Sequence, residues 1–352
     1  MKIQDHKIEL KGMTLEKLRE YLESIGEKKF RGNQIFNWMY NNLAMEFDEM
    51  QNIPKPLRDK LQSETTLKTL ELKTSKSSNN TGTVKYVFST YDDRNIETVL
   101  IPDGERNTLC ISTQVGCPLD CKFCATGLMG YKRNLSTGEI VDQYFLSAKA
   151  NPKTSITNIV YMGMGEPLLN FERTLESLDI FTHELNKVVG RNRITVSTSG
   201  IPQRIIDLAE SGYRVKMALS LHSCFEDIRS RIMPINNKYS LSDNLDALKQ
   251  YVRISKTKIT FEYTMLKGIN DRKEDAEALA KICKDIPSKV NVIPFNSIAH
   301  MSPGGISAEL EPTSKSGILD FVEELRNRNV RVMVRETQGD DIAAACGQLA
   351  VN

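Results

Sequence analysis

The sequence predicts an α/β fold in which a partial (β/α) barrel follows a small helical domain and a β-hairpin. From residue 108 onward, short β-prone runs alternate with segments of helical periodicity. This arrangement produces a parallel sheet with right-handed crossovers, and six or seven such units suffice for an open or partial barrel. Before residue 70, by contrast, apolar residues recur mainly at helical spacing, which indicates a separate helical unit.

Residues 1–75 are predicted to form the helical domain. Apolar residues at helical spacing predict one helix over 15–25 and a second over 30–39, and a third short helix follows Pro56. The segment 73–82 is polar and rich in turn-forming residues, so we predict that it is the linker to the next unit.

A β-hairpin is predicted next, because two β-prone runs flank the turn-forming residues Asp92, Asp93 and Asn95. Residues 76–105 are thus assigned to linker and hairpin, and residues 106–352 to the barrel with its C-terminal segment. The predicted barrel strands are 108–112, 157–162, 193–198, 215–221, 259–266, 290–295 and 330–335. The predicted helices between them include 138–148, 175–185, 241–252 and 273–283.

The composition is that of an ordinary soluble protein, with 352 residues, 40% hydrophobic and 26% charged. No apolar run approaches the length of a membrane span, and residues 1–13 lack the apolar core of a signal peptide. We therefore expect a cytoplasmic protein with no membrane partner. The net charge of +2 says little about partners, and we interpret neighbouring cations such as Arg229 and Arg231 as solvated surface.

Three of the seven cysteines form one compact motif, Cys117, Cys121 and Cys124. Crowded cysteines in a chain without an export signal indicate metal or redox chemistry rather than a disulfide framework. Structural zinc usually takes four ligands in two separated pairs, and no convincing fourth ligand stands nearby. A 4Fe-4S cluster normally takes four thiolates, so three would leave one iron free for another ligand. We therefore predict an iron–sulfur cluster, with zinc as the alternative.

Other candidate residues follow predicted strands at their carboxyl ends, which form the ligand-binding face of a β/α barrel. They are Gly165, Glu166, Ser197, Ser220, Leu221, His222 and Asn296. Taken singly, each is more typical of a turn or a helix cap. Taken together, they predict one binding pocket.

The cysteine spacing resembles the signature of the radical S-adenosylmethionine (SAM) superfamily. The stretches CKFCATG, MGMGEPLLN, ITVSTSG, IPFN and RETQGDDIAAACGQLA make the resemblance more specific. In combination they resemble the RlmN branch of the RNA adenine methyltransferases, from about residue 95 to the end. The run FRGNQIFNWMY is similar to the accessory domain of that family. The resemblance implies a barrel of the radical SAM type, a 4Fe-4S cluster on the three cysteines, and SAM in the predicted pocket.

The resemblance also implies residue roles. Gly165 and Glu166 would contact the ammonium group of SAM. Two SAM molecules serve each turnover: Cys346 takes a methyl group from the first, and the second, cleaved at the cluster, yields a radical that removes a hydrogen from that methyl. The resulting methylene radical adds to adenine, and Glu97 accepts the ring proton. The Cys110 thiolate then releases the product by forming a transient disulfide with Cys346. Because both cysteines act as thiolates, we expect surroundings that lower their pKa.

The implied substrates are RNA: an adenine in the peptidyl-transferase region of 23S rRNA, and the adenosine 3′ of the anticodon in some tRNAs. Carbon 2 of the adenine is the expected target. We also expect a one-electron reductant of the flavodoxin type and a monomeric protein. The mixture of Lys28, Lys29 and Arg31 with Trp38 and Tyr40 suits phosphate and base contacts, so residues 1–75 are predicted to dock RNA.

Three alternatives stay open. The sister branch of the family methylates carbon 8 of the same adenine with similar cysteine chemistry. A radical SAM enzyme that does not methylate would have no use for Cys110 and Cys346. A non-enzymatic zinc or iron–sulfur RNA-binding protein would leave the strand-end residues unexplained.

Overall fold

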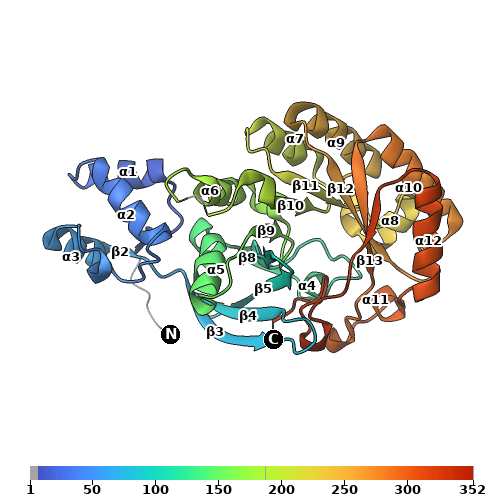
Figure 1. Ribbon diagram of the computed structural model, residues 1–352, viewed down its shortest axis with the longest axis horizontal. Helices are drawn as coiled ribbons and strands as arrows, with labels where there is room; N and C mark the ends of the chain where they lie inside the picture. Colours follow the sequence, from blue (N-terminus) through green and yellow to red (C-terminus); the bar gives the residue numbers. More distant parts are fainter. Residues whose placement is uncertain (1–6, 187, 352) are drawn as a thin grey trace.

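The computed structural model describes residues 7–186 and 188–351, and a ten-stranded sheet runs through it (Figure 1). The strand order is β14-β13-β12-β11-β10-β9-β6-β5-β4-β3. The pairs from β6 to β14 are all parallel, whereas β3 to β6 pair antiparallel. Within the described residues β14 and β3 are free edges, so the sheet curves without closing. The predicted α/β class and partial barrel are confirmed.

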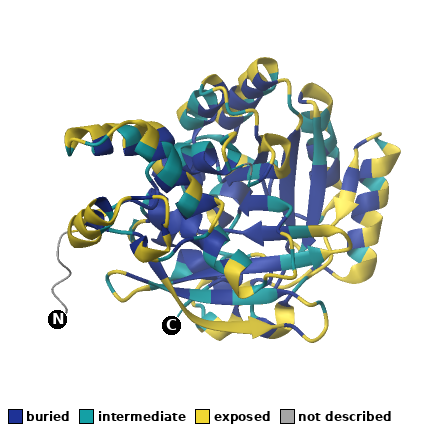
Figure 2. Cartoon of the chain, turned by 60° about the vertical axis from the view of Figure 1, so that its left-hand side comes forward, coloured by how far each residue is buried: buried dark blue, intermediate teal, exposed yellow. Residues whose placement is uncertain are grey.

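The parallel strands are β6 (Arg106–Cys110), β9 (Asn158–Tyr161), β10 (Ile194–Thr198), β11 (Lys216–Ser220), β12 (Ile259–Met265), β13 (Ser288–Pro294) and β14 (Val332–Val334). Each lies on one of the seven predicted runs. They form where the chain is continuously apolar, because a parallel sheet is covered on both faces. Figure 2 shows these strands mostly buried, and all seven residues of β12 are buried.

Helices pack around the outside of these strands (Figure 1). The main ones are α5 (Thr137–Ala150), α6 (Phe171–Thr182), α7 (Pro202–Glu210), α9 (Leu241–Ser255), α10 (Lys273–Asp285) and α12 (Lys315–Asn327). Shorter helices are α4 (Ala125–Leu128), α8 (Glu226–Ile232) and α11 (Ile306–Glu309), and a small sheet pairs β7 (Gln114–Gly116) with β8 (Tyr131–Asn134). No helix in the described part of the chain is long and apolar enough to cross a membrane.

The hairpin is formed as predicted by β4 (Val84–Thr90) and β5 (Asn95–Asp103), but the predicted linker is wrong. Residues 73–77 belong to β3 (Leu70–Ser77), which pairs antiparallel with β4. Every residue of β3 after Leu70 is exposed, as expected of an edge strand that packs against nothing. A strand without a buried face carries no apolar alternation, so its sequence looks like a linker.

The N-terminal unit contains the three predicted helices, α1 (Leu15–Ser24), α2 (Phe30–Tyr40) and α3 (Lys55–Glu64). A short parallel pair that we did not predict, β1 (Ile8–Glu9) with β2 (Thr65–Thr66), joins its two ends. Tyr40 is buried, its hydroxyl accepts a hydrogen bond from the Gly12 N–H at 2.9 Å, and its ring packs on Phe145 of α5. Tyr40 is therefore part of the packing between the two units and is not free to contact RNA.

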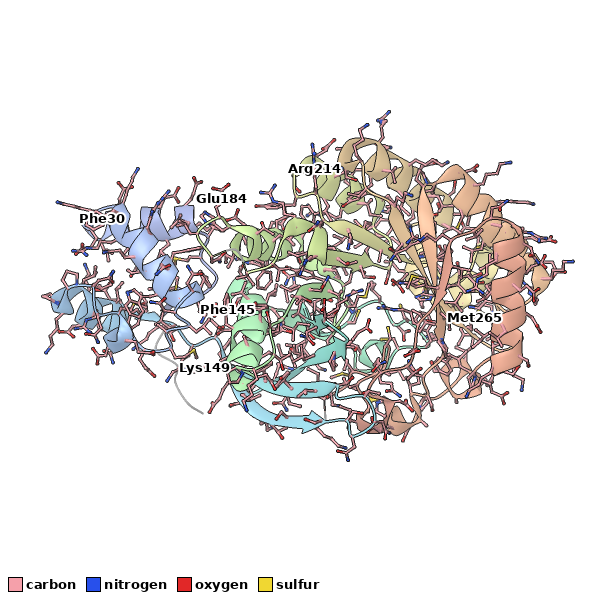
Figure 3. The ribbon with its side chains drawn as sticks, viewed as in Figure 1. Phe30, Phe145, Lys149, Glu184, Arg214 and Met265 are labelled. Atoms are coloured by element: carbon pink, nitrogen blue, oxygen red, sulfur yellow. The ribbon has the colours of Figure 1, made fainter. Side chains whose placement is uncertain are left out.

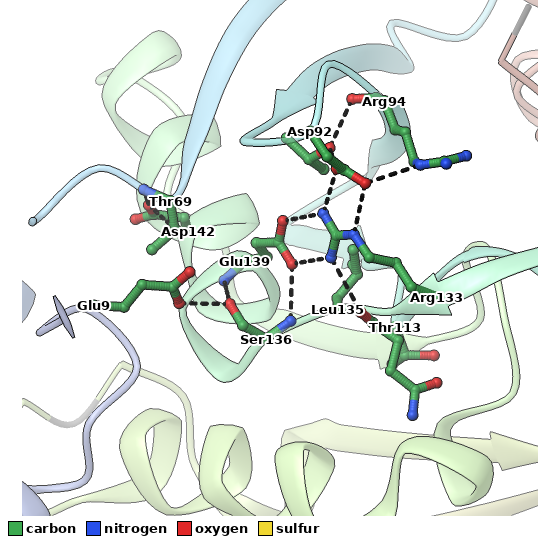
Figure 4. Close-up of polar contacts among 12 residues, drawn as sticks. Glu9, Thr69, Asp92, Arg94, Thr113, Arg133, Leu135, Ser136, Glu139 and Asp142 are labelled. Atoms are coloured by element: carbon green, nitrogen blue, oxygen red, sulfur yellow. Dashed lines mark hydrogen bonds and ion pairs between the residues drawn. The ribbon is translucent and has the colours of Figure 1, made fainter. Parts of the chain in front are cut away.

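A polar network fastens the hairpin turn to the barrel (Figure 4). The Arg133 guanidinium contacts Asp92 in the turn and Glu139 in the first turn of α5, both at 2.7 Å. Hydrogen bonds from Arg133 hold the pKa of Asp92 below its usual range. The Ser136 hydroxyl caps α5 and also donates to Glu9 of β1 at 2.8 Å. The network thus links the hairpin, α5 and the N-terminal unit.

An ion pair between Lys11 and Asp142 joins the N-terminal unit to α5 at 3.0 Å, with both side chains fully buried. Replacing one partner leaves an uncompensated buried charge, so we expect Lys11→Met to lower the free energy of unfolding by about 3–5 kcal/mol. The double variant Lys11→Met/Asp142→Leu removes both charges and should recover most of that loss. Urea unfolding of the three proteins measures this. A Lys11→Met protein as stable as the unmodified chain would contradict the prediction.

Candidate active site

A cavity of about 480 Å³ opens among the carboxyl ends of the parallel strands. Eleven of the predicted site residues line it: Cys110, Cys117, Cys121, Cys124, Gly165, Glu166, Ser197, Ser220, His222, Asn296 and Cys346. They come from separate loops and strand ends, and the fold brings them together in one space. Glu97 and Leu221 do not line this cavity.

The cysteine loop is held in place by backbone hydrogen bonds. The Cys117 N–H donates to the Gly130 carbonyl at 3.2 Å, and the Lys122 N–H donates to the Ile232 carbonyl at 2.9 Å. Cys124 immediately precedes the short helix α4. These contacts hold all three thiols against the cavity.

The electrostatics of the three thiols fit an iron–sulfur cluster. Burial raises the pKa of Cys117 to about 12 and raises that of Cys121 well above its usual value. A negative charge on Cys124 raises both pKa values further, so the three thiols lie within electrostatic reach of one another. Thiolates at Cys117 and Cys121 need a bound cation to be stable, and an iron cluster supplies it.

The arrangement differs from a site for a single ion. Among the described residues, no three cysteine, histidine, aspartate or glutamate side chains converge closely enough to hold one metal ion. A 4Fe-4S cluster requires the thiolates to be spread apart, because each binds a different iron. A donor set of three thiols on one loop suits a 4Fe-4S cluster with one open iron.

The Gly165–Glu166 turn combines a special backbone conformation with a buried carboxylate. Gly165 has φ of 97°, and a Cβ there would lie 2.5 Å from the Gln114 side chain, so only glycine fits. The Glu166 carboxylate accepts backbone hydrogen bonds from Ser199 at 2.8 Å and Leu168 at 3.0 Å. Burial nevertheless raises the pKa of Glu166. A cationic ligand group in the cavity would stabilise this carboxylate as an anion.

His222 is locked as a neutral side chain beside the cysteine loop. Its Nδ1 accepts a hydrogen bond from the Thr264 N–H at 3.0 Å, so Nε2 carries the proton of the neutral ring. Burial lowers the pKa of His222 to about 3, and the Arg229 charge adds to this effect. The ring meets Phe123 edge-on at 4.5 Å between centroids. His222 thus offers an N–H donor to the cavity at all ordinary pH values.

Arg229 corrects one expectation, because it is fully buried and not a solvated surface residue. Its guanidinium donates to the carbonyls of Ser199 at 2.6 Å, Leu221 at 3.1 Å and Ser220 at 3.2 Å. These carbonyls belong to the loops that follow β10 and β11. Arg229 therefore fixes the strand ends that carry Ser197, Ser220 and His222.

Leu221 is placed differently from the other predicted pocket residues, and its part in holding SAM stays a prediction. Its side chain is fully buried in the core. Its backbone N–H donates to the Glu262 carbonyl at 3.0 Å, and its own carbonyl accepts from Arg229. The residue at this position acts by holding the backbone after β11, not by offering a side chain to the cavity.

The C-terminal segment that carries Cys346 docks onto the cysteine loop. The Gly347 carbonyl accepts from the Ala125 N–H at 2.7 Å, and the Leu349 carbonyl accepts from the Thr126 hydroxyl at 2.6 Å. The Asn296 side-chain amide donates to the Cys346 carbonyl at 3.0 Å. Asn296 therefore positions Cys346 as well as lining the cavity.

Cys110 ends β6 and lies near Cys346, since a charge on Cys346 raises the pKa of Cys110. Our expectation of lowered pKa values is wrong for both thiols. Burial raises the pKa of Cys110 to about 12 and that of Cys346 to about 11, although the Arg335 charge opposes both shifts. The surface that Cys346 exposes belongs to the cavity, so protein atoms surround the thiol. Burial therefore disfavours the thiolate form of both cysteines.

Glu97 lies behind the C-terminal segment. Its Oε1 pairs with Lys85 at 2.9 Å, and its Oε2 accepts from the Ala350 N–H at 2.9 Å. Lys85 also donates to the Ala343 carbonyl at 3.1 Å. In this structure the carboxylate anchors the segment that carries Cys346, and the role of proton acceptor stays a prediction.

Two residues that the sequence analysis did not single out also line the cavity, Glu262 and Arg335. Burial raises the pKa of Glu262, and Asn291 donates to its carboxylate at 2.9 Å. An acidic residue in the middle of the apolar run ITFEYTML was the available signal, because buried carboxylates need a partner. Arg335 had no such signal, since it follows a short, exposed edge strand.

Comparisons with known proteins agree with this geometry. Residues 8–67 match the family described as the ribosomal RNA large subunit methyltransferase N-terminal domain, and residues 111–281 match the radical SAM superfamily. The chain is 40% identical to the dual-specificity RNA methyltransferase RlmN of Alcanivorax borkumensis, covering 97% of this chain and 90% of that protein. It is also 40% identical to the RlmN protein of Marinomonas sp. strain MWYL1, covering 97% and 93%.

A solved structure extends the comparison to three dimensions. A radical SAM methyltransferase from Sphaerobacter thermophilus superposes with a TM-score of 0.91 at 39% identity, covering 97% of this chain and 99% of that one. Membership of the radical SAM superfamily implies a 4Fe-4S cluster and SAM, which the cavity described above fits. The chain belongs to the RlmN family and is a SAM-dependent RNA methyltransferase of the radical SAM class.

Proposed function

We propose that the protein methylates carbon 2 of an adenine in the peptidyl-transferase region of 23S rRNA and of the adenosine 3′ of the anticodon in some tRNAs. The observation that carries this proposal is the placement of Cys110 and Cys346. The two thiols lie far apart in the sequence, yet they line the same cavity as the three cysteines of the cluster loop. The relatives from Alcanivorax and Marinomonas bear the name of dual-specificity RNA methyltransferases.

In the proposed mechanism, Cys346 is the methyl carrier and Cys110 the resolving thiol. The Cys346 thiol loses its proton and takes a methyl group from one SAM molecule. The cluster, when bound, supplies the electron that cleaves a second SAM and so activates this methyl group. The activated carbon bonds to adenine and links the RNA to Cys346. The Cys110 thiolate then attacks the Cys346 sulfur, so that the S–S bond forms as the bond from the Cys346 sulfur to the bridging carbon breaks. The electron pair of the broken bond stays with that carbon, which takes up a proton and becomes the methyl group of the freed base.

The cavity residues have supporting roles in this proposal. Glu166 and the Gly165 turn would hold the ammonium of SAM, and His222 and Ser197 would hold its remaining polar groups. Glu97 would accept the adenine proton after the C-terminal segment shifts, since both of its oxygens are engaged here. In the N-terminal unit, Arg31 lies over the exposed ring of Phe30 at 4.8 Å, a surface that would suit RNA phosphates and bases.

The test is to map the methylated carbon. RNA carrying deuterium at adenine carbon 2 is incubated with reconstituted enzyme, SAM and a reductant. The RNA is then digested to nucleosides, whose masses are measured by mass spectrometry. We expect 2-methyladenosine that has lost the deuterium, in both rRNA and tRNA fragments. Retention of the deuterium in an 8-methyladenosine product would contradict the proposal and assign the sister activity.

A further inference from the structure

A second cavity, of about 300 Å³, lies at the opposite end of the barrel from the active site. Its lining is strongly basic, with Arg214, Lys216, Lys258, Lys289 and Arg331 among nine residues and no acidic residue. Lys216 begins β11, Lys258 directly precedes β12, Lys289 lies at the start of β13, and Arg331 directly precedes β14. The five cations thus gather where adjacent strands begin.

Within the described residues, these cations lack direct ion-pair partners. Across residues 7–186 and 188–351, none of the five forms an ion pair with an acidic side chain. Burial lowers the pKa of Lys289 and the nearby Glu262 carboxylate opposes this shift. The charges of Lys216, Arg335 and Arg331 lower the pKa further, so the cations lie close enough to repel. A site that gathers unpaired like charges is stabilised by a bound anion.

The two cavities belong to one barrel interior. Alternate residues of a strand share a face, so Lys216 faces the same way as Ser220, which lines the active-site cavity. On β13, Lys289 lines the basic cavity and Ile293, four residues on, lines the active-site cavity. Arg331 and Arg335, at the two ends of β14, line the two cavities in the same way. Four residues of strand span about 13 Å. Buried Ala218, Glu262 and Asn291 fill the interior between the two cavities, so RNA would reach the basic cavity over the outside of the barrel.

We propose that the basic cavity at the amino ends of β11 to β14 binds backbone phosphates of the RNA substrate. This inference rests on RNA being the substrate and names the part of the barrel that holds its backbone. An RNA strand carries a regular series of phosphates, which suits a row of five cations better than a single small anion does. An acidic electron-donor protein suits it less, because electrons must reach the cluster cysteines at the other end of the strands, whereas a long RNA can extend from one end of the barrel to the other.

The test uses the double variant Lys216→Gln/Lys289→Gln in the reconstituted full-length enzyme. The matched control is Lys149→Gln/Lys273→Gln, which removes two exposed lysines that make no ion pair within the described chain. Lys149 lies on α5, well away from Arg214 at the rim of the basic cavity (Figure 3). The dissociation constants of a tRNA transcript and of a hairpin from the large-subunit rRNA are measured between 50 and 300 mM salt.

We expect the Lys216→Gln/Lys289→Gln variant to bind both RNAs roughly tenfold more weakly at low salt. The slope of log affinity against log salt should fall by about 1.4, because each lost phosphate contact to a single strand removes about 0.7. The control should keep the affinity and slope of the unmodified enzyme. Iron content and reductive SAM cleavage, measured on the same preparations, report whether the catalytic end of the barrel is intact.

Three results would overturn the inference. One is an unchanged RNA affinity and salt slope in the double variant while the unmodified enzyme binds and methylates RNA. Another is loss of inorganic phosphate binding with RNA affinity intact, which would assign the cavity to a free anion. The third is a variant that binds RNA normally but loses activity when flavodoxin supplies the electrons and regains it with dithionite. That result would assign the basic cavity to the protein reductant. If the unmodified enzyme methylates no RNA, the proposed function fails instead.

Discussion

Replacing Cys110 with alanine is expected to leave RNA covalently attached to the protein through Cys346. Cys346 still takes up and transfers its methyl carbon, but the adduct lacks the thiolate that would release it. The attachment requires the two thiols to act in sequence, which their placement beside the same cavity allows. Denaturing gel electrophoresis with and without nuclease, followed by mass spectrometry of the linked peptide, measures the result.

Two further variants separate this mechanism from simple destabilisation. Cys346→Ala should abolish methylation without forming any adduct, because no methyl carrier is present. Cys283→Ala, on α10 and away from the active-site cavity, should methylate RNA normally. All three variants should keep their iron, since none of these cysteines belongs to the cluster loop. A Cys110→Ala protein that cleaves SAM yet runs as an unshifted band would contradict the two-cysteine mechanism.

Replacing any one of Cys117, Cys121 and Cys124 with alanine is expected to remove most of the bound iron and reduce methylation to an undetectable level. Each thiolate holds a different corner of the cluster, so two cannot substitute for three. Burial raises the pKa of Cys117 and Cys121, which leaves little reason for their thiolates to persist without bound metal. Iron analysis and the absorbance that dithionite bleaches measure the effect after anaerobic reconstitution.

The control for the cluster variants is again Cys283→Ala, which should retain full iron and its visible spectrum. The variants should also form no RNA adduct when combined with Cys110→Ala, because no radical can be generated. Full iron content in the triple variant would show that the cluster lies elsewhere.

Much of the fold follows from local patterns in the sequence. The seven parallel strands appear where apolar β-prone runs stand, because all but the edge strand β14 are largely buried. The segment 73–77 was misread because β3 is an edge strand with exposed side chains and therefore no apolar pattern. The burial of Arg229 was not predicted for a related reason: most of its partners are backbone carbonyls, which any residue supplies, so the sequence carries no pattern that indicates them.

The sequence by itself determined the chemistry that is available: three thiols in one loop, two further cysteines, and polar residues at strand ends. It could do so because ligand spacing and strand endings are local properties of the chain. Only the tertiary structure decided how Cys346 reaches the cavity, through contacts of Gly347 and Leu349 with α4 and of Ala350 with Glu97. It also decided that burial raises the pKa of Cys110 and Cys346, because desolvation depends on atoms brought in from the whole barrel.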